Sequence, residues 1–355
     1  GEMLSRYGSS LLLTAFDDIT ARTNRRMRAL IAELPDGTYE FEDVMDDDGL
    51  GTVDIKIKLK ITVSGENVLF DFTGTDKQVA GNINLTTNAT ESAVCYALKA
   101  LLDPEVPNNF GVLDSFELKT EHGTVVDCAF PAPVAARAHT CQRVADIIIG
   151  ALADALPHEA VGASNGANTT AVFSGIHPET GDSYLYLETL GGGFGGRSDR
   201  DGTDGIQVHI TNTSNLPIEA IEMEYPLRVE SYGFIEDSGG AGKYRGGLGL
   251  RRVISPVDHD CTFNGAGERF ANQPWGIFGA GAGKSGCFVH ERSDGSSQQL
   301  EIKPSGITLR GDERVVVETP GAGGYGEPSE RPADLVEVDR ASQKFSPDFL
   351  AKHYD

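Results

Sequence analysis

The polar residues between positions 204 and 215 are the first candidates for chemistry. Asp204, His209, Asn212 and Asn215 follow one another in a segment that we expect to form a strand over 206–212. A histidine can act as a general base or ligate a metal ion, because its ring titrates near neutral pH. A lone histidine can equally be a hydrogen-bonded structural residue, and both interpretations of His209 stay open. His209 and Asp204 are the predicted catalytic residues.

The glycine-rich loop before this segment is a candidate binding element. It runs from Gly191, Gly192 and Gly193 to Arg197, between an expected strand at 184–190 and the one at 206–212. Glycines allow backbone amides to approach a ligand closely and give a lid its mobility. The alternative is a flexible turn without a ligand.

A second candidate binding element is Arg137 with His139. Both come directly before an expected helix over 140–156, with Thr140 as a possible N-cap. A cationic pair at a helix N-terminus suits an anion or a carboxylate. A cap with a surface ion pair is the alternative.

Several segments resemble known binding motifs but lack a feature that the motif requires. The segment Gly279–Ser285 resembles a phosphate-binding loop, but Phe278 stands where the first glycine must be, and a strand is expected to follow instead of a helix. Asp46-Asp47-Asp48-Gly49 lacks the ligand pattern of an EF-hand. The eight histidines have no metal-ligand spacing, so we assign no metal to any residue of this chain.

The overall charge limits the classes of molecule that can be the main partner. The 355 residues include 30 Lys and Arg against 53 Asp and Glu, a net charge of −23, which argues against nucleic acid or an anionic membrane surface as the partner. No run of about 18 apolar residues is present to span a membrane. Five cysteines without a paired spacing are typical of a reducing compartment, and we expect a cytoplasmic protein.

The elements that must position these residues can be placed by periodicity. We expect an amphipathic helix over 4–34, an alternating strand over 53–63 with a hairpin return at 68–73, a helix over 86–102, a strand over 112–127 and short strands after 225. The predicted class is α+β. The predicted parts are 1–127 (helix and sheet), 128–235 (central, with the glycine-rich loop), 236–328 (β-rich) and 329–355 (a tail or docking arm).

A family resemblance adds to these patterns. Many short segments resemble the hydantoinase B / 5-oxoprolinase family in that family's order, over about residues 4–328: they include 34–40, 71–76, 143–146, 150–152, 191–193, 209–213, 217–219, 224–227, 238–242, 245–247 and 319–326. The resemblance marks Gly191–Gly193, Arg197, His209, Asn212 and Thr213 as a conformational and binding region.

The resemblance implies an activity, partners and cofactors. It implies ATP-dependent opening of a cyclic amide in a hetero-oligomer, with ATP and Mg on a hydantoinase A-type subunit that phosphorylates the substrate. It also implies a divalent metal on an N-terminal region of the B-type subunit that this chain lacks, so we expect a fragment or a split subunit. A ketone carboxylase of the acetone or acetophenone type and a non-catalytic scaffold subunit are the alternatives.

Overall fold

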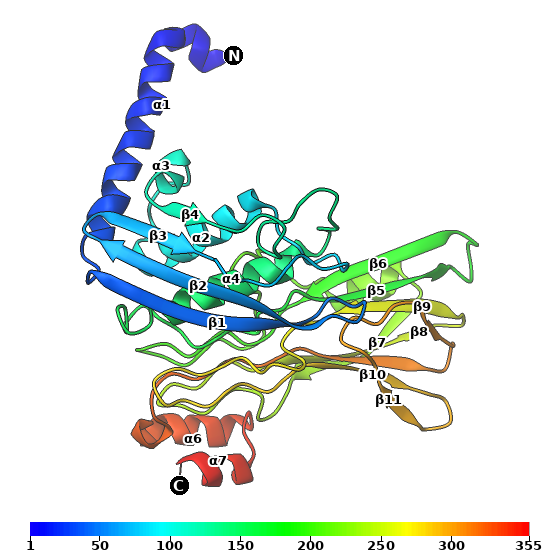
Figure 1. Ribbon diagram of the computed structural model, residues 1–355. Coiled ribbons are helices and arrows are strands. Elements are labelled where there is room, and N and C mark those ends of the chain that lie inside the picture. Colours follow the sequence, from blue (N-terminus) through cyan, green and yellow to red (C-terminus); the bar gives the residue numbers. More distant parts are fainter. Residues whose placement is uncertain (355) are drawn as a thin grey trace.

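The computed structural model describes residues 1–354, which form an N-terminal body and a two-sheet C-terminal body (Figure 1). The helices are α1 (Glu2–Ile31), α2 (Thr87–Leu102), α3 (Phe110–Leu113), α4 (Arg137–Ala151), α5 (Ile218–Glu224), α6 (Ala333–Ser342) and α7 (Pro347–Tyr354), with a 3-10 turn at Pro328–Glu330. The strands are β1 (Gly37–Asp47), β2 (Val53–Ser64), β3 (Asn67–Asp71), β4 (Glu117–Lys119), β5 (Thr169–Ile176), β6 (Ser183–Leu190), β7 (Leu227–Phe234), β8 (Leu250–Pro256), β9 (Cys261–Ala266), β10 (Cys287–Glu291), β11 (Ser297–Gln299), β12 (Ile307–Leu309) and β13 (Arg314–Glu318). Helices beside mostly antiparallel sheets confirm the predicted α+β class.

The N-terminal body is a sheet covered on one face by α2 and α4. The strand order is β1-β2-β3-β4, and β2 pairs with both β1 and β3 in antiparallel register. The alternation predicted for 53–63 is confirmed, because Ile55, Ile57 and Ile61 are buried in the core beneath the helices. The helix expected over 86–102 is also confirmed as α2.

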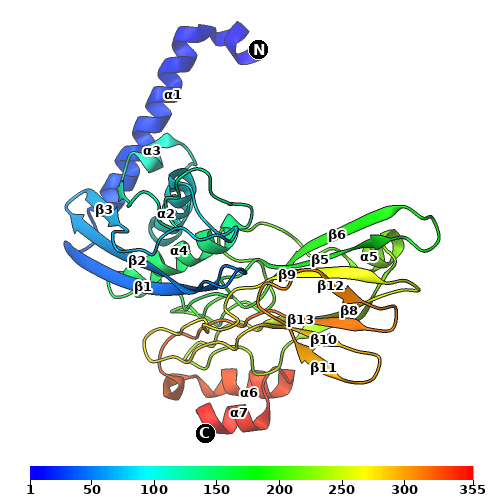
Figure 2. The same ribbon diagram turned by 45° about the vertical axis from the view of Figure 1, so that its right-hand side comes forward.

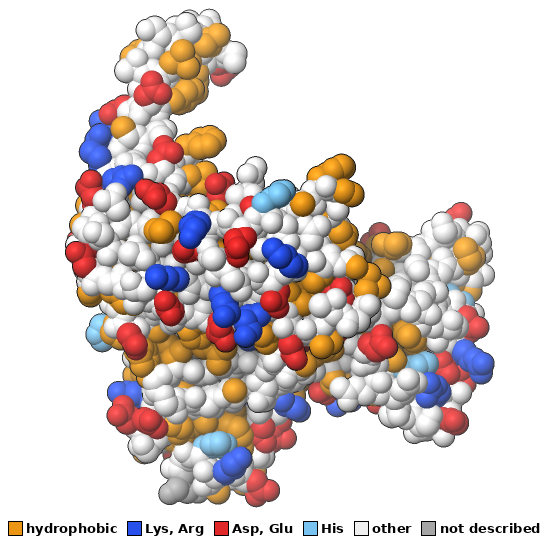
Figure 3. Space-filling view, viewed as in Figure 1, with side chains coloured by type: hydrophobic (Ala, Val, Ile, Leu, Met, Phe, Trp, Pro, Cys, Tyr) orange, Lys and Arg blue, Asp and Glu red, His pale blue; other side chains and the backbone are white. Residues whose placement is uncertain are grey.

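Helix α1 follows the predicted periodicity but packs over only part of its length. Thr23, Met27 and Ile31 are buried against the body. The half before them projects away from the molecule and bends at Gly8 (Figures 1 and 2). Phe16 and Ile19 precede Thr23 at helical spacing, yet they are 56% and 49% exposed, and apolar side chains are visible along the projecting helix (Figure 3). Periodicity therefore predicted the helix but not how much of it is buried.

The strand predicted over 112–127 is wrong for most of its length. The short helix α3 occupies Phe110–Leu113, and only Glu117–Lys119 pairs, in parallel, with β3. The remainder follows turns instead of a long ladder: Asp127 donates its N–H to the carbonyl of Thr124 at 3.1 Å, and the Asp127 carbonyl accepts from the N–H of Gly123 at 2.8 Å.

The C-terminal body consists of two sheets packed face to face. Their orders are β12-β9-β5-β6 and β11-β10-β13-β8-β7, and a shared core joins them (Figure 2). Phe173, Phe263 and Phe288 lie at the centre of this core. The short strands expected after 225 are confirmed. Strand β5 pairs with β9, so one of these sheets is built from residues on both sides of position 235.

The glycine-rich segments form a layer of extended backbones between the two bodies and the C-terminal helices. Gly193 donates its N–H to the carbonyl of Pro320 at 3.1 Å, and Gly240 donates to Ala322 at 2.8 Å. A Cβ atom at Gly246 would lie 1.9 Å from the carbonyl oxygen of Ala322. The backbones approach so closely that only glycine fits at such positions.

The segment expected to be a polar tail forms helices α6 and α7, which pack beneath this layer (Figure 1). Leu350 and Phe345 are buried there with Leu248. Within residues 1–354, no helix is both long and apolar enough to cross a membrane.

Candidate functional site

Tyr96, His209 and Asp146 form a hydrogen-bonded row. Nε2 of His209 lies 2.9 Å from Oδ1 of Asp146, and Nδ1 lies 3.3 Å from the hydroxyl oxygen of Tyr96. The side chains of His209 and Asp146 are each only 1% exposed. The row joins helix α2, the loop that carries His209 and helix α4, so tertiary packing fixes the imidazole from both sides.

The protonation of the row follows from its surroundings. Burial favours the neutral acid, but the hydrogen bond from His209 and the charge of Arg269 lower the pKa of the Asp146 carboxyl below its ordinary value. Burial and the nearby Asp146 carboxylate raise the pKa of Tyr96 to about 12. The ionised Asp146 therefore accepts the Nε2 proton, and the neutral Tyr96 hydroxyl donates to Nδ1. This arrangement leaves Nδ1 as the basic nitrogen.

A cavity of about 550 Å³ borders the row. Tyr96, His209, Phe194 and Arg197 contribute its aromatic and polar wall. Half of the remaining lining residues are apolar, namely Ala100, Leu101, Pro104, Ile149 and Val161, and half are polar or charged, namely His158, Glu159, Ser198, Asp199 and Arg200. The guanidinium of Arg197 lies 4.7 Å from the centre of the Phe194 ring, where the ring face attracts the charge. A cavity that combines an apolar surface with oriented polar groups is the usual form of a small-molecule site.

The loop that carries His209 is held by side chains instead of a sheet. Gln142 donates from Nε2 to the carbonyl of Val208 and to the hydroxyl of Thr211, both at 2.9 Å. His209 itself has a left-handed backbone, with φ of 49°. The strand predicted over 206–212 is therefore wrong: a left-handed residue cannot continue a ladder, and only Ile206 makes a bridge, to Gly192.

Comparison with known families identifies the relatives of this chain. The family model described as hydantoinase B/oxoprolinase matches residues 1–328. The chain belongs to this family. It is 32% identical over 348 residues to the B component of a putative D-/L-hydantoinase from Pseudomonas sp. strain NS671, covering 94% of this chain and 58% of that one. It is 38% identical over 293 residues to an uncharacterized protein of Methanocaldococcus jannaschii, covering 82% and 50%.

Two solved structures share the fold of this hydantoinase B family chain. The ATP-dependent caprolactamase of Pseudomonas jessenii has a TM-score of 0.87 at 27% identity, over 99% of this chain and 62% of that one. An acetone carboxylase has a TM-score of 0.85 at 16% identity, over 99% and 54%, which shows the fold alone. This chain spans about half to three-fifths of the length of these four proteins.

Among the residues marked by the family resemblance, His209 and Arg197 lie at the cavity, and the others do not line it. Gly191–Gly193 are buried in the glycine layer, where a Cβ at Gly193 would lie 2.2 Å from the carbonyl oxygen of Gly247. Close backbone packing thus explains these glycines without a ligand. Asn212 and Thr213 are exposed on the His209 loop. Contact of these five residues with a substrate stays a prediction.

The expected anion site at Arg137 and His139 is not assembled in this family member. Both residues lie in the first turn of α4 instead of before it, and the Thr140 hydroxyl donates to the carbonyl of Ile83 instead of capping the helix. Arg137 is exposed. Burial, with the nearby charges of Lys303 and Arg143, lowers the pKa of His139 to about 3, so its ring is neutral. Arg137 therefore faces water, whereas His139 faces the core.

Asp204, the second predicted catalytic residue, does not line the cavity. Its Oδ1 accepts from Nη1 of Arg245 at 3.0 Å, and its Oδ2 accepts from Nζ of Lys344 at 2.7 Å. Burial opposes ionisation, but the charge of Arg245 and the Lys344 bond lower the pKa of Asp204. This carboxylate ties the glycine layer to the C-terminal helices. A catalytic role for it stays a prediction, and the geometry places Asp146 beside His209 instead.

The sequence-based selection missed Tyr96 and Asp146. Asp146 carried a signal, because it interrupts the buried stripe of α4 between Val144 and Ile147, and a charge in a core requires a partner. Tyr96 carried none, since an aromatic residue on a packed helix is ordinary. Within residues 1–354, no group of three or more His, Cys, Asp or Glu side chains is placed to hold a metal ion.

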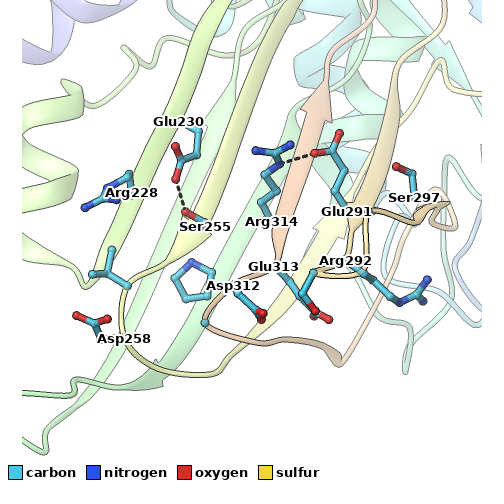
Figure 4. Close-up of a pocket in the computed structure, with 15 residues that line it drawn as sticks. Arg228, Glu230, Ser255, Asp258, Glu291, Arg292, Ser297, Asp312, Glu313 and Arg314 are labelled. Carbon is cyan, nitrogen blue, oxygen red and sulfur yellow. Dashed lines mark hydrogen bonds and ion pairs between the residues drawn. The ribbon is translucent and has the colours of Figure 1, made fainter.

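A larger groove of about 650 Å³ lies on the C-terminal body, over β7, β8, β10 and β13 (Figure 4). Within it, Arg314 pairs with Glu291, and Glu230 accepts a hydrogen bond from the Ser255 hydroxyl at 2.9 Å. Exposed pairs of this kind are common on protein surfaces. We place the site at the smaller cavity, because a buried and oriented histidine borders it.

Proposed function

We propose that this chain is the substrate-holding part of a hydantoinase B-type subunit in an ATP-dependent hydrolase that opens cyclic amides. The family match over residues 1–328 supports this assignment. Relatives are named as the B component of a hydantoinase, a 5-oxoprolinase and the beta component of a caprolactamase, and hydantoin, 5-oxoproline and caprolactam are all cyclic amides.

The observation that carries the proposal is the Tyr96–His209–Asp146 row at a partly apolar cavity. Asp146 holds the Nε2 proton, so Nδ1 can take a proton from a water molecule placed beside it. The oxygen of that water adds to the ring carbonyl carbon. The proton on Nδ1 then passes to the ring nitrogen as the carbon–nitrogen bond breaks. When the carbonyl oxygen carries a phosphoryl group, this cleavage leaves an acyl phosphate, and a second water molecule converts it to the carboxylate and inorganic phosphate. Tyr96 holds the imidazole until a substrate or water replaces its hydroxyl.

Arg197 would hold an anionic group of the bound substrate. Its guanidinium borders the cavity and stacks on Phe194, and its charge acts on the Tyr96 hydroxyl. A phosphoryl group placed on the substrate by a partner would suit this cation. In the proposal, a hydantoinase A-type subunit with ATP and Mg supplies that group, in a cytoplasmic hetero-oligomer.

The proposal assigns no metal to this chain. The acidic and imidazole side chains of residues 1–354 do not gather into a ligand set, and those of Asp146 and His209 are already bonded to each other. A divalent metal, which the family resemblance implies, would need ligands outside these residues. No step above depends on one.

The test is substrate-stimulated ATP hydrolysis by the complete complex with its A-type partner. Phosphate release should rise with hydantoin, 5-oxoproline or caprolactam, and His209→Ala should lower turnover by about 10²-fold or more. Stimulation by acetone with bicarbonate, and by none of the cyclic amides, would identify a ketone carboxylase instead. Wild-type turnover in the assembled His209→Ala complex would leave this chain a scaffold.

A further inference from the structure

Asp146 is bonded at both of its oxygens. Oδ1 lies 2.9 Å from Nε2 of His209, and Oδ2 accepts from Nη2 of Arg269 at 2.8 Å. The same Nη2 atom lies 2.9 Å from Oδ2 of Asp43 on β1. Arg269 is fully buried, so no water competes for these contacts. The imidazole is thus connected through one carboxylate to a guanidinium anchored in the N-terminal sheet.

The position of Arg269 is itself fixed by the fold. The Asp46 carboxylate on β1 accepts the backbone N–H groups of Phe270, Ala271 and Asn272, at 2.6 to 3.0 Å. This turn therefore cannot shift without breaking three bonds to a charged acceptor.

Both partners of Asp146 have strained backbones. Arg269 and His209, the two partners of Asp146, both have left-handed backbones, with φ of 62° and 49°. Gly166 is left-handed as well, and a Cβ there would lie 3.1 Å from Nε of Arg269 and 3.2 Å from Oδ2 of Asp146. Non-glycine residues in this conformation store free energy and cluster at functional sites.

We propose that Arg269 is a positioning residue that holds Asp146 against His209 and thereby keeps the proton of the neutral imidazole on Nε2, with Nδ1 as the nitrogen free to act as base. The inference rests on the proposed role of His209 as the base. Arg269 does not line the cavity and acts only through Asp146. Its guanidinium fixes the direction of the carboxylate, and its charge keeps that carboxylate ionised.

The sign of the effect on pH dependence follows from the groups around the row. His209 faces Tyr96 from α2, Asp146 from α4, and Phe194 with Arg197 from the glycine-rich loop. Without the Arg269 cation, protonation of Asp146 becomes easier, because a buried positive charge that lowers its pKa has left. A protonated Asp146 no longer accepts the Nε2 proton of His209, so the acidic limb of the activity profile must move to higher pH.

The experiment measures the His209 tautomer by NMR of the ¹⁵N-histidine-labelled chain, which requires no activity. In the wild-type chain the Nε2-protonated tautomer should dominate. Arg269→Met should give a mixture of tautomers and, in the complex, an acidic limb raised by about one pH unit. Arg269→Lys keeps the cation and should restore most of both properties.

Arg252→Met is the matched control. Arg252 is another fully buried arginine, paired with Glu188, and it does not contact Asp146. Both methionine variants should lose stability, but only Arg269→Met should change the His209 tautomer.

A wild-type tautomer in Arg269→Met overturns the proposal. If Arg269→Met does not fold, Arg269→Gln takes its place. An unchanged His209 tautomer and an unchanged acidic limb in Arg269→Gln, with the new side chain displaced from Asp146, would overturn the proposal equally. A changed tautomer with wild-type turnover for His209→Ala would contradict the proposed function alone.

Discussion

Asp146 and His209 lie 63 positions apart in the chain and meet at 2.9 Å, with both side chains almost completely buried. A carboxylate that accepts the Nε2 proton fixes which imidazole nitrogen is basic. The pair therefore sets the chemistry available in the adjoining cavity, and most of the predictions below follow from it or from the elements that hold it.

Replacement of the carboxylate should disable the row. Asp146→Asn keeps the shape, but the amide nitrogen can donate to Nε2 and favour the wrong tautomer. We expect turnover in the complex to fall by about 10²-fold or more. Asp204→Asn is the control, because Asp204 lies away from the cavity and should alter stability more than turnover. Equal losses of turnover in the two variants would return Asp204 to the catalytic set.

Removal of the Tyr96 hydroxyl should change function while leaving the packing intact. Tyr96→Phe keeps the ring and removes the donor to Nδ1. We expect a loss of about tenfold or more in turnover with little change in melting temperature. In an absorbance titration, the wild type should retain one neutral tyrosine to a pH near 12 that the variant lacks. A difference spectrum that appears near pH 10 would contradict the environment described for Tyr96.

The stability of the chain in acid should depend on Asp43. Burial opposes its ionisation, but the charges of Arg143 and Arg269 and the bond from Trp275 lower the pKa of Asp43 to about 2. A lowered carboxyl pKa stabilises the folded state above the ordinary value near 3.8 and loses that contribution as the pH falls toward 2. Urea unfolding of the wild type between pH 5 and 2 should show this loss. Asp43→Asn should be less stable at pH 5 and show a flatter dependence.

The glycine layer should tolerate no side chain. Gly246→Ala places a methyl group 1.9 Å from a carbonyl oxygen, so the backbones must separate, and we expect a loss of about 3 kcal/mol in unfolding free energy. The control is Gly233→Ala on β7, where nothing lies within 4 Å of the new Cβ. Its unfolding free energy should stay within about 0.5 kcal/mol of the wild type. Similar urea midpoints for both variants would contradict close packing of the layer.

The two halves of α1 should respond differently to truncation. Met27→Ala removes a fully buried side chain and should cost about 2–5 kcal/mol, whereas Phe16→Ala, at a 56% exposed position, should cost about 0.5 kcal/mol or less. Urea unfolding of the two variants measures the difference. A large loss for Phe16→Ala would mean that the projecting half packs against the body in solution.

The sequence predicted those parts of the fold whose signals are local. The alternation around Ile55 and Ile57 gave the buried face of β2, because successive strand residues point to opposite sides. The helix expected over 86–102 is likewise present as α2. Periodicity failed at 112–127, where the polar groups bond within turns, and in the first half of α1, where a helical stripe exists but nothing in the described chain covers it.

The residues of the candidate site also divide into those that the sequence indicated and those that only the fold brought together. The sequence by itself determined that His209 and Arg197 are unusual residues beside a glycine-rich segment, and family similarity strengthened both. Only the tertiary structure decided that Asp146 and not Asp204 meets His209, that Tyr96 completes the row, and that the glycines pack against backbones. The physical reason is distance along the chain: the pairing of a buried charge depends on which elements the whole fold brings together.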